Sequence, residues 1–180
     1  MAGHSDNDLG APEFTDPVKV LIVIAPYYSK IADAQLASAR GVVERAGVSH
    51  ETIEVPGSLE IPGAITIAHR LSNYDGFVAL GCVIRGRTSH YDVVVNESAR
   101  GLMLLGLQGL AIGNGIITVE NIDQAEERAD VERLDTAGGA AVAALHLIAI
   151  ARRFGGAKKS VGFSPGEYLI AGNPDGPQSA

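Results

Sequence analysis

The sequence has no tryptophan, a single cysteine and few aromatic residues, which make up 5% of its 180 positions. One cysteine excludes a disulfide within the chain and favours a reducing compartment. No apolar stretch approaches the roughly 20 residues that are needed to cross a bilayer. Residues 1–16 are polar and lack the apolar core of a secretory signal. We therefore expect a cytoplasmic protein with no membrane partner.

Positive charge is also scarce. Lysine and arginine number 14 against 21 aspartates and glutamates, for a formal net charge of -7. A nucleic-acid-binding protein needs a concentrated basic face, so we expect no nucleic-acid partner. Apolar residues are abundant, at 46%, and so is glycine, with 22 residues. This composition is typical of a compact α/β protein.

Hydrophobic periodicity predicts alternating strands and helices. Apolar segments predict strands at 18–25, 77–84 and 111–119, and a short strand is expected at 50–55, before Pro56 and Gly57. Helical spacing predicts helices at 31–46, 59–71, 91–107, 121–132 and 138–154. The order predicts a three-layer α/β fold, with a flavodoxin-like four-stranded parallel sheet flanked by helices and right-handed crossovers.

The chain has a suitable length for one domain. We expect this domain to span 17–154, preceded by a flexible arm at 1–16. A flexible tail at 155–180, rich in glycine and proline, should follow outside the core. One apolar patch in this tail, at 168–170, leaves a docking role open.

The loop after the third predicted strand carries the clearest chemical signal. It contains Arg87, Thr88 and His90 between the apolar run 77–84 and a helical pattern that starts at about residue 91. Free N–H groups at a helix start favour an anion. The loop is therefore predicted to form a phosphate pocket with a proton carrier beside it.

Three further segments follow predicted strands, at 26–28, 56–60 and 118–128. In an open parallel sheet, ligands bind at the carboxyl ends of the strands. Together with the loop, these segments supply an aromatic platform, a hydroxyl group, a carboxylate and cations. That inventory suits a planar polar heterocycle with a polyol arm, bound beside a small phosphorylated compound.

Four segments in register make the chain resemble the lumazine synthase family. They are V-P-G-S-L-E-I-P at 55–62, G-C-V-I-R-G-R-T-S-H-Y-D at 81–92, N-E-S-A-R-G at 96–101 and N-G-I-I-T-V-E-N-I-D-Q-A-E-E-R-A at 114–129. The resemblance covers about 18–154 in the family's order and spacing, and it implies the lumazine synthase fold.

The resemblance implies a transferase of riboflavin biosynthesis with two small-molecule substrates and no metal or organic cofactor. The 5-amino group of 5-amino-6-(D-ribitylamino)uracil would attack the ketone of 3,4-dihydroxy-2-butanone 4-phosphate. Loss of phosphate and water, with ring closure, would give 6,7-dimethyl-8-ribityllumazine. Such chemistry needs mainly co-location of the reactants and timed proton transfers near neutral pH.

His90 matches the family's proton-transfer residue. An imidazole ordinarily titrates at about pH 6.5, so it suits proton transfer under physiological conditions. The resemblance implies that the phosphate is held by Gly86, Arg87, Thr88 and Arg128. The turn could otherwise be merely solvated, and Arg128 could be an i,i+4 partner of another side chain on its helix.

The resemblance assigns a further set of residues to the ribitylaminouracil: Tyr27, Ser58, Leu59, Glu60, Cys82, Val83, Ile84 and Asn114. Alternative structural roles remain open for three of them. Tyr27 could cap the core, Ser58 could be a helix N-cap, and the Cys82 side chain is better explained as a small buried filler than as a nucleophile.

Two positions depart from the family pattern. Asn114 stands where many members place an aromatic residue that reaches the pyrimidine site of the neighbouring subunit. Ala137 stands where the family usually has a lysine near the phosphate. The second departure predicts weaker phosphate binding than usual, and it predicts that Ala137→Lys would tighten that binding.

The resemblance also implies a homo-oligomer in which neighbouring subunits share each site. The linker at 129–138 is one residue longer than in the shell-forming pattern, which favours a pentamer, with a decamer or a 60-subunit shell as alternatives. In the family, the N-terminal arm adds a strand to the next subunit.

A weakened paralogue that binds a flavin or lumazine, or acts as a scaffold, is the alternative function. A generic phosphate-binding domain would explain the fold but not the four motifs.

Overall fold

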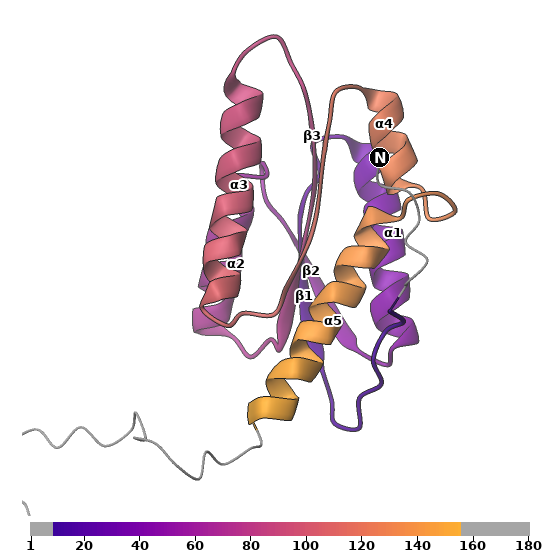
Figure 1. The fold of residues 1–180 in the computed structure, drawn as a ribbon, viewed down its shortest axis with the longest axis vertical. Coiled ribbons are helices and arrows are strands. Elements are labelled where there is room, and N and C mark those ends of the chain that lie inside the picture. Colours follow the sequence, from indigo (N-terminus) through magenta and orange to yellow (C-terminus); the bar gives the residue numbers. More distant parts are fainter. Residues whose placement is uncertain (1–8, 156–180) are drawn as a thin grey trace, which may run out of the picture.

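The computed structural model describes residues 9–155 of the chain, and Figure 1 shows their fold. The strands are β1 (Lys19–Ala25), β2 (Ser49–Glu54), β3 (Gly76–Ile84) and β4 (Ile112–Val119). The helices are α1 (Ser29–Arg45), α2 (Ile61–Leu71), α3 (His90–Leu107), α4 (Ile122–Ala129) and α5 (Thr136–Gly155). All nine predicted elements are present in the predicted order.

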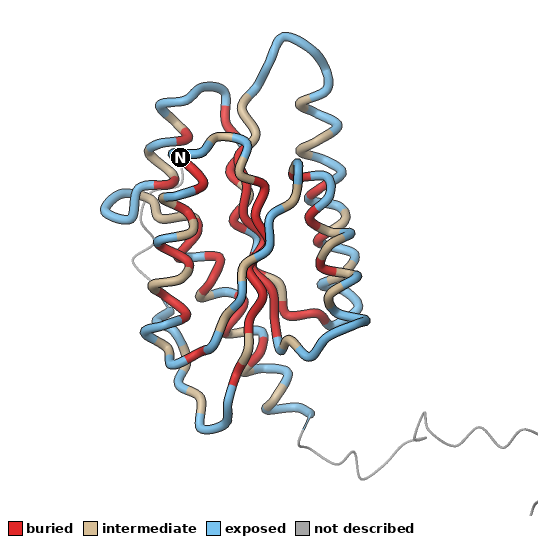
Figure 2. The backbone as a smooth tube through the Cα atoms, turned by 180° about the vertical axis from the view of Figure 1, so that it is seen from behind, coloured by how far each residue is buried: buried red, intermediate tan, exposed pale blue. Residues whose placement is uncertain are grey.

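The strands form one four-stranded sheet in the order β2-β1-β3-β4, and every neighbouring pair is parallel. The predicted α/β class and parallel sheet are therefore confirmed. The two central strands are buried along almost their whole length, as their continuous apolar sequences predict. Figure 2 shows this burial as a red band through the middle of the molecule.

Helices cover both faces of the sheet and give the molecule three layers. Helices α2 and α3 lie on one face, and α1, α4 and α5 lie on the other (Figure 1). The strands of the sheet pack against both helical layers through separate apolar clusters. Because all strands are parallel, their carboxyl ends and the loops that follow them meet at one edge.

Helix α5 is the one described helix with the length and hydropathy of a membrane span, which the sequence analysis did not expect. Its apolar side chains have another explanation. Ala141, Ala144 and Leu145 are fully buried and belong to the cluster formed with α1 and the central strands. The buried face of α5 therefore accounts for part of its apolar composition, since 39% of the candidate span is buried.

Glycine in β4 allows α5 to pack directly on the sheet. A Cβ atom on Gly113 would collide with the backbone carbonyl of Ala140, and one on Gly115 would lie 2.8 Å from Leu80. Asn114 lies between them on the opposite side of the strand and is exposed. Tight helix packing thus explains the two glycines, and it leaves Asn114 free to serve another purpose.

Helix α2 begins two residues later than predicted. Residues 57–60 form a turn closed by a hydrogen bond from the Glu60 N–H to the Gly57 carbonyl, at 3.2 Å. The first helical bond runs from Ala64 to the Glu60 carbonyl, at 2.9 Å. Pro62 suits the first turn because it lacks an N–H group. Glu60 occupies the N-cap position, so the N-cap role considered for Ser58 is wrong.

Helix α4 ends at Ala129, three residues earlier than predicted, and a structured turn leads to α5. The Asp130 carboxylate accepts a hydrogen bond from the Glu132 N–H, at 2.9 Å. Asp135, with a φ of 39°, accepts hydrogen bonds from the Gly138 N–H, at 3.1 Å, and from the Ser38 hydroxyl. These carboxylates hold the loop in place and let α5 start at Thr136.

The described part of the N-terminal arm runs along α5. His146 lies 2.9 Å from the Gly10 carbonyl, and Arg152 donates to the Asp16 carbonyl at 3.0 Å. The Arg152 guanidinium also lies over the ring of Phe14, 5.6 Å from its centroid. The predicted tail and its patch at 168–170 lie outside the described residues, apart from Gly155.

Candidate active site

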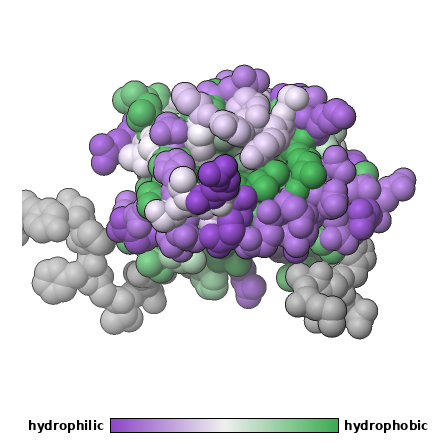
Figure 3. All heavy atoms as spheres, turned by 90° about the horizontal axis from the view of Figure 1, so that it is seen from above, coloured by the Kyte–Doolittle hydropathy of each residue, from purple (hydrophilic) through white to green (hydrophobic). Residues whose placement is uncertain are grey.

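A pocket of about 480 Å³ opens at the carboxyl edge of the sheet. Its walls come from the end of β1, the β2–α2 turn, the end of β3, the loop after β3 and the first turns of α3. Seen from above, Figure 3 shows a patch of hydrophobic surface bordered by hydrophilic side chains. The predicted site edge therefore holds a concave, mixed apolar and polar pocket.

Ten of the thirteen candidate site residues line this single pocket. They come from four separate chain segments and are Tyr27, Ser58, Leu59, Glu60, Cys82, Val83, Ile84, Gly86, Thr88 and His90. The parallel sheet brings these segments together because each one follows, or ends, a strand at the same edge.

Tyr27 projects into solvent at the mouth of the pocket, with 75% of its surface exposed. It meets Tyr28 edge to face, with ring centroids 5.1 Å apart. A side chain this exposed does not cap the core, so that alternative for Tyr27 is wrong. The ring is available to lie against a planar ligand.

Cys82 is 7% exposed, and it packs with Ile31 of α1 and Ala125 of α4. Burial raises the pKa of the Cys82 thiol to about 11. A protonated, buried thiol is a poor nucleophile. The structure thus agrees with the interpretation of the Cys82 side chain as a filler, and the backbone of this strand end is the part available to a ligand.

His90 is the first residue of α3, and it is exposed on the wall of the pocket. Its N–H points to the Thr88 hydroxyl, at 3.4 Å. Gly86 and Thr88 line the same pocket, whereas Arg87 lies in the same turn outside it. The loop therefore places an imidazole next to a turn at a helix start, which is the arrangement predicted for phosphate.

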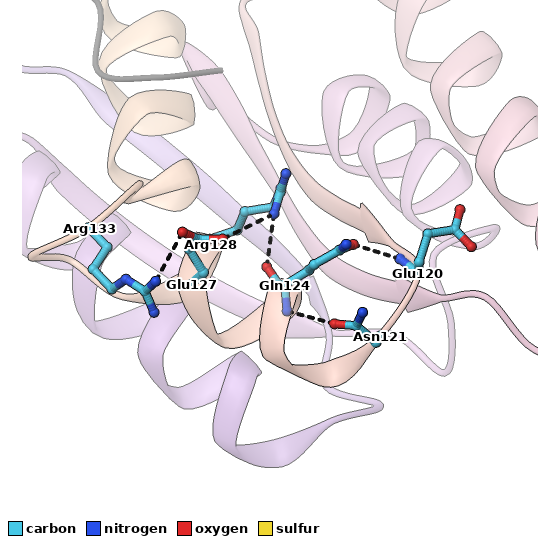
Figure 4. Close-up of polar contacts among 6 residues, drawn as sticks. All are labelled: Glu120, Asn121, Gln124, Glu127, Arg128 and Arg133. Carbon is cyan, nitrogen blue, oxygen red and sulfur yellow. Dashed lines mark hydrogen bonds and ion pairs between the residues drawn. The ribbon is translucent and has the colours of Figure 1, made fainter. Parts of the chain in front are cut away.

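Arg128 lies on α4, outside this pocket. Its guanidinium donates to the Gln124 carbonyl at 3.1 Å and lies 3.9 Å from the Glu127 carboxylate. Figure 4 shows these contacts, together with the pairing of Glu127 and Arg133 at 3.0 Å. The considered i,i+4 contact is thus present, but to the backbone of Gln124. One-third of the Arg128 side chain remains exposed, at 34%.

Asn114 also lies away from the pocket formed by its own chain. It is the third residue of β4, aligned with Ala79 of β3, whereas the pocket forms at the far end of that strand. Its side chain accepts a hydrogen bond from the Ile116 N–H at 3.0 Å. Within one chain, therefore, Asn114 and Arg128 are not brought together with His90, whereas Arg87 lies in the same turn as His90 but does not line the pocket.

Ala137 is fully buried in the core cluster beside α1. A lysine here would extend into packed apolar side chains and could not reach a phosphate at the surface. The burial of Ala137 argues against a phosphate-binding position here and against the expected gain from Ala137→Lys.

Five lining residues were not among the candidates: Tyr28, Pro56, Gly57, Tyr91 and Val94. Helical spacing could have identified Val94, because it lies four residues after His90 on the same face of α3. Tyr91 follows His90 directly. Tyr28, Pro56 and Gly57 adjoin candidate residues in the segments that follow β1 and β2.

Among residues 9–155, no group of three or more histidine, cysteine, aspartate or glutamate residues is arranged to hold a metal ion. The pocket instead offers an imidazole, a carboxylate, hydroxyl groups and backbone N–H groups. This set of groups can bind an anion and a polar ring and can move protons between them.

Taken together, the fold and the pocket define a three-layer α/β protein with a small-molecule site at the carboxyl edge of its sheet. The family model for 6,7-dimethyl-8-ribityllumazine synthase matches residues 17–152. The chain belongs to the 6,7-dimethyl-8-ribityllumazine synthase family.

Curated relatives agree with this assignment. A protein of Jannaschia sp. named 6,7-dimethyl-8-ribityllumazine synthase is 74% identical over 165 residues, which cover 92% of this chain and 93% of the relative. A protein of Sphingopyxis alaskensis with the same name is 54% identical over 76% of this chain and 96% of its own. A protein of Methylobacterium radiotolerans with the same name is 47% identical over 88% of this chain and 99% of its own length.

Proposed function

We propose that the protein condenses 5-amino-6-(D-ribitylamino)uracil with 3,4-dihydroxy-2-butanone 4-phosphate, giving 6,7-dimethyl-8-ribityllumazine, phosphate and water. This is the transferase reaction of riboflavin biosynthesis that names the family. The observation that carries the proposal is the convergence of Tyr27, Glu60 and His90 on one pocket. An aromatic platform, a carboxylate and a proton carrier there suit a polar heterocycle that must react.

The ribitylaminouracil fits between Tyr27, the end of β3 and the β2–α2 turn. Tyr27 offers its exposed ring to one face of the pyrimidine, and the backbone of residues 82–84 offers hydrogen-bonding groups to its edge. The turn at 58–60 supplies a hydroxyl and a carboxylate for the ribityl chain. These groups orient the 5-amino group toward the mouth of the site.

The phosphorylated ketone fits beside the start of α3. The N–H groups of the Gly86–Thr88 turn and the positive end of the helix favour its phosphate. The 5-amino group of the first substrate then adds to the ketone carbon. Loss of water forms a C=N bond, and elimination of phosphate leaves an enol that tautomerises to a ketone. The ribitylamino nitrogen then adds to this ketone carbon, and loss of a second water closes the ring.

His90 is the group that moves protons in these steps. Addition of an amine to a ketone, loss of water and loss of phosphate each need a proton to be given or taken. His90 lies on the pocket wall next to the phosphate turn, so it can reach the carbon atoms that lie between the ketone and the phosphate. A positioned general acid–base group typically contributes about 10²–10⁴-fold to the rate.

The proposal includes a homo-oligomer, with a pentamer favoured. Large apolar side chains are exposed on α2 and α3: Leu71 is 82% exposed, Met103 64% and Leu107 78%. Apolar patches of this kind mark association surfaces. Asn114 and Arg128 lie outside the pocket of their own chain, so they would complete the site of a neighbouring copy. We also propose that the protein is cytoplasmic.

A product assay tests the function. The purified protein is mixed with both substrates, and lumazine formation is followed by fluorescence against the spontaneous reaction without protein. We expect rapid, saturable formation of lumazine and release of one phosphate for each product. A rate no higher than the spontaneous one, with tight binding of lumazine, would favour the alternative of a weakened, lumazine-binding paralogue.

A further inference from the structure

Arg85 makes three contacts that fix its guanidinium between two parts of the fold. Its Nε lies 3.0 and 2.9 Å from the two carboxylate oxygens of Glu120, and its Nη1 lies 3.2 Å from Asp92. Its Cζ also lies over the Tyr91 ring, 4.0 Å from the centroid. A guanidinium is suited to such combined pairing and stacking, and an ammonium group is not.

The segment that carries Glu120 is hydrogen-bonded to its neighbours at both ends. The Arg85 N–H donates to the Val119 carbonyl at 2.9 Å, which extends the pairing of β3 with β4. The Glu120 N–H donates to the Gln124 side chain at 3.0 Å, and the Asn121 side chain caps α4 (Figure 4). The backbone of Glu120 thus follows β4 directly and is bonded to α4.

The start of α3, in contrast, lacks an anchor in the core. The buried residues of α3 are Ser98 and Leu102, and both lie at least two turns beyond His90. The first turn carries His90, Tyr91 and Asp92 in succession, and the preceding loop, 85–89, is exposed. Arg85 contacts two of these three residues, so it ties the first turn of α3 to the rigid β4–α4 junction.

The guanidinium of Arg85 stays protonated. Its hydrogen bond to Glu120 raises the pKa of the guanidinium further above its usual value, and the bond to Asp92 adds to this effect. The guanidinium therefore stays charged over the pH range in which an imidazole titrates.

We propose that Arg85 is a positioning residue that holds His90 and Tyr91 in place for the reaction by fastening the first turn of α3 to Glu120. This inference rests on the proposed function. Arg85 does not line the pocket, so it acts through its neighbours and not by contact with substrate. Its loss should lower turnover while leaving the pyrimidine subsite on β3 and the β2–α2 turn intact.

The test combines Arg85→Met with a matched control. Arg100→Met likewise removes an arginine that pairs with a carboxylate, that of Glu97, but this arginine lies on α3 and outside the pocket. We expect Arg85→Met to lower kcat on the order of tenfold, with less than twofold change in KM for the ribitylaminouracil. Arg85→Lys should restore part of the turnover, and Arg100→Met should match wild type.

A double-mutant cycle separates positioning from a general structural effect. Because Arg85 acts through His90, Arg85→Met should cost less than about twofold in a His90→Ala background. An undiminished tenfold loss in that background, or turnover of Arg85→Met equal to that of Arg100→Met, would overturn the inference. Absence of catalysis in the wild type would instead overturn the proposed function itself.

Discussion

Ser58 and Gly81 lie in contact across the β2–α2 turn and β3, so that a Cβ on residue 81 would lie 2.9 Å from the Ser58 Oγ. The absence of a side chain at Gly81 lets Ser58 sit buried against the strand, at 6% exposure, where it lines the pocket. The first glycine of the motif at 81–92 therefore shapes the wall of the pocket at the proposed pyrimidine subsite.

Gly81→Ala should displace the Ser58 turn. We expect KM for the ribitylaminouracil to rise and the free energy of unfolding to fall by about 1–3 kcal/mol, as for other overpacked sites. The companion change Ser58→Gly should relieve the collision and restore much of the stability. Gly139→Ala is the control, because a Cβ there meets nothing within 4 Å. Equal effects of the two glycine substitutions would contradict the contact.

Ala137→Lys should destabilise the protein and should not tighten phosphate binding. Ala137 is fully buried, so its replacement would force an ammonium group into apolar packing. We expect a loss of about 3 kcal/mol or more in urea unfolding. Gly139→Lys places the same charge two residues along on an exposed part of α5 and should be tolerated. A lower KM for the ketone phosphate in Ala137→Lys would restore the original assignment.

Cys82 should resist thiol reagents in the native protein. Burial raises the pKa of its thiol from the ordinary value of 9.0 to about 11, so the group stays protonated at pH 8. Titration with a chromogenic disulfide should show slow labelling of the native protein and fast labelling of one thiol after denaturation. Fast native labelling would show that the strand end is open.

The same shift predicts a pH dependence of stability. Between pH 9 and about 11, the unfolded thiol ionises while the native one stays protonated. The contribution of this group to stability is therefore complete below pH 9 and is lost as the pH rises to about 11. Cys82→Ala should show a smaller fall in unfolding free energy over that range. Parallel curves for the two proteins would contradict this account.

Mixing two inactive variants should restore activity if neighbouring copies share each site. His90→Ala and Arg128→Ala each damage every site of a uniform oligomer. In a mixed oligomer, an intact His90 from one chain meets an intact Arg128 from another at about a quarter of the sites, by random assortment. Co-refolded protein should regain that fraction of turnover. No recovery in verified mixed oligomers would place both residues in the same chain's site.

Sequence patterns predicted the fold well because the strongest signals are local. The run at 18–25 has no polar interruption except Lys19, and it forms β1, which is buried from Val20 to Ala25. The motif at 81–92 predicted a phosphate-binding turn with His90 at the end of β3, and Gly86, Thr88 and His90 do line one pocket. Strand ends in a parallel sheet converge by geometry, so this part of the site needed no knowledge of packing.

The failures share a different cause. The start of α2 depends on a turn at 57–60 that apolar spacing does not reveal. The burial of Ala137 depends on how α5 packs on α1, and an alanine gives no sign of its exposure. Arg85 belongs to the motif at 81–92, but its partner Glu120 lies 35 positions further along the chain, so the motif alone does not reveal the pair. Tertiary contacts of this kind are not visible in periodicity.

The most direct measurement of the central claim is the rate of lumazine formation by His90→Ala relative to wild type, at equal oligomer concentration and with both substrates saturating. We predict a fall in kcat of about 10²-fold, with unchanged assembly and unfolding free energy. Turnover equal to that of wild type would show that the imidazole on the pocket wall does not move protons in this reaction.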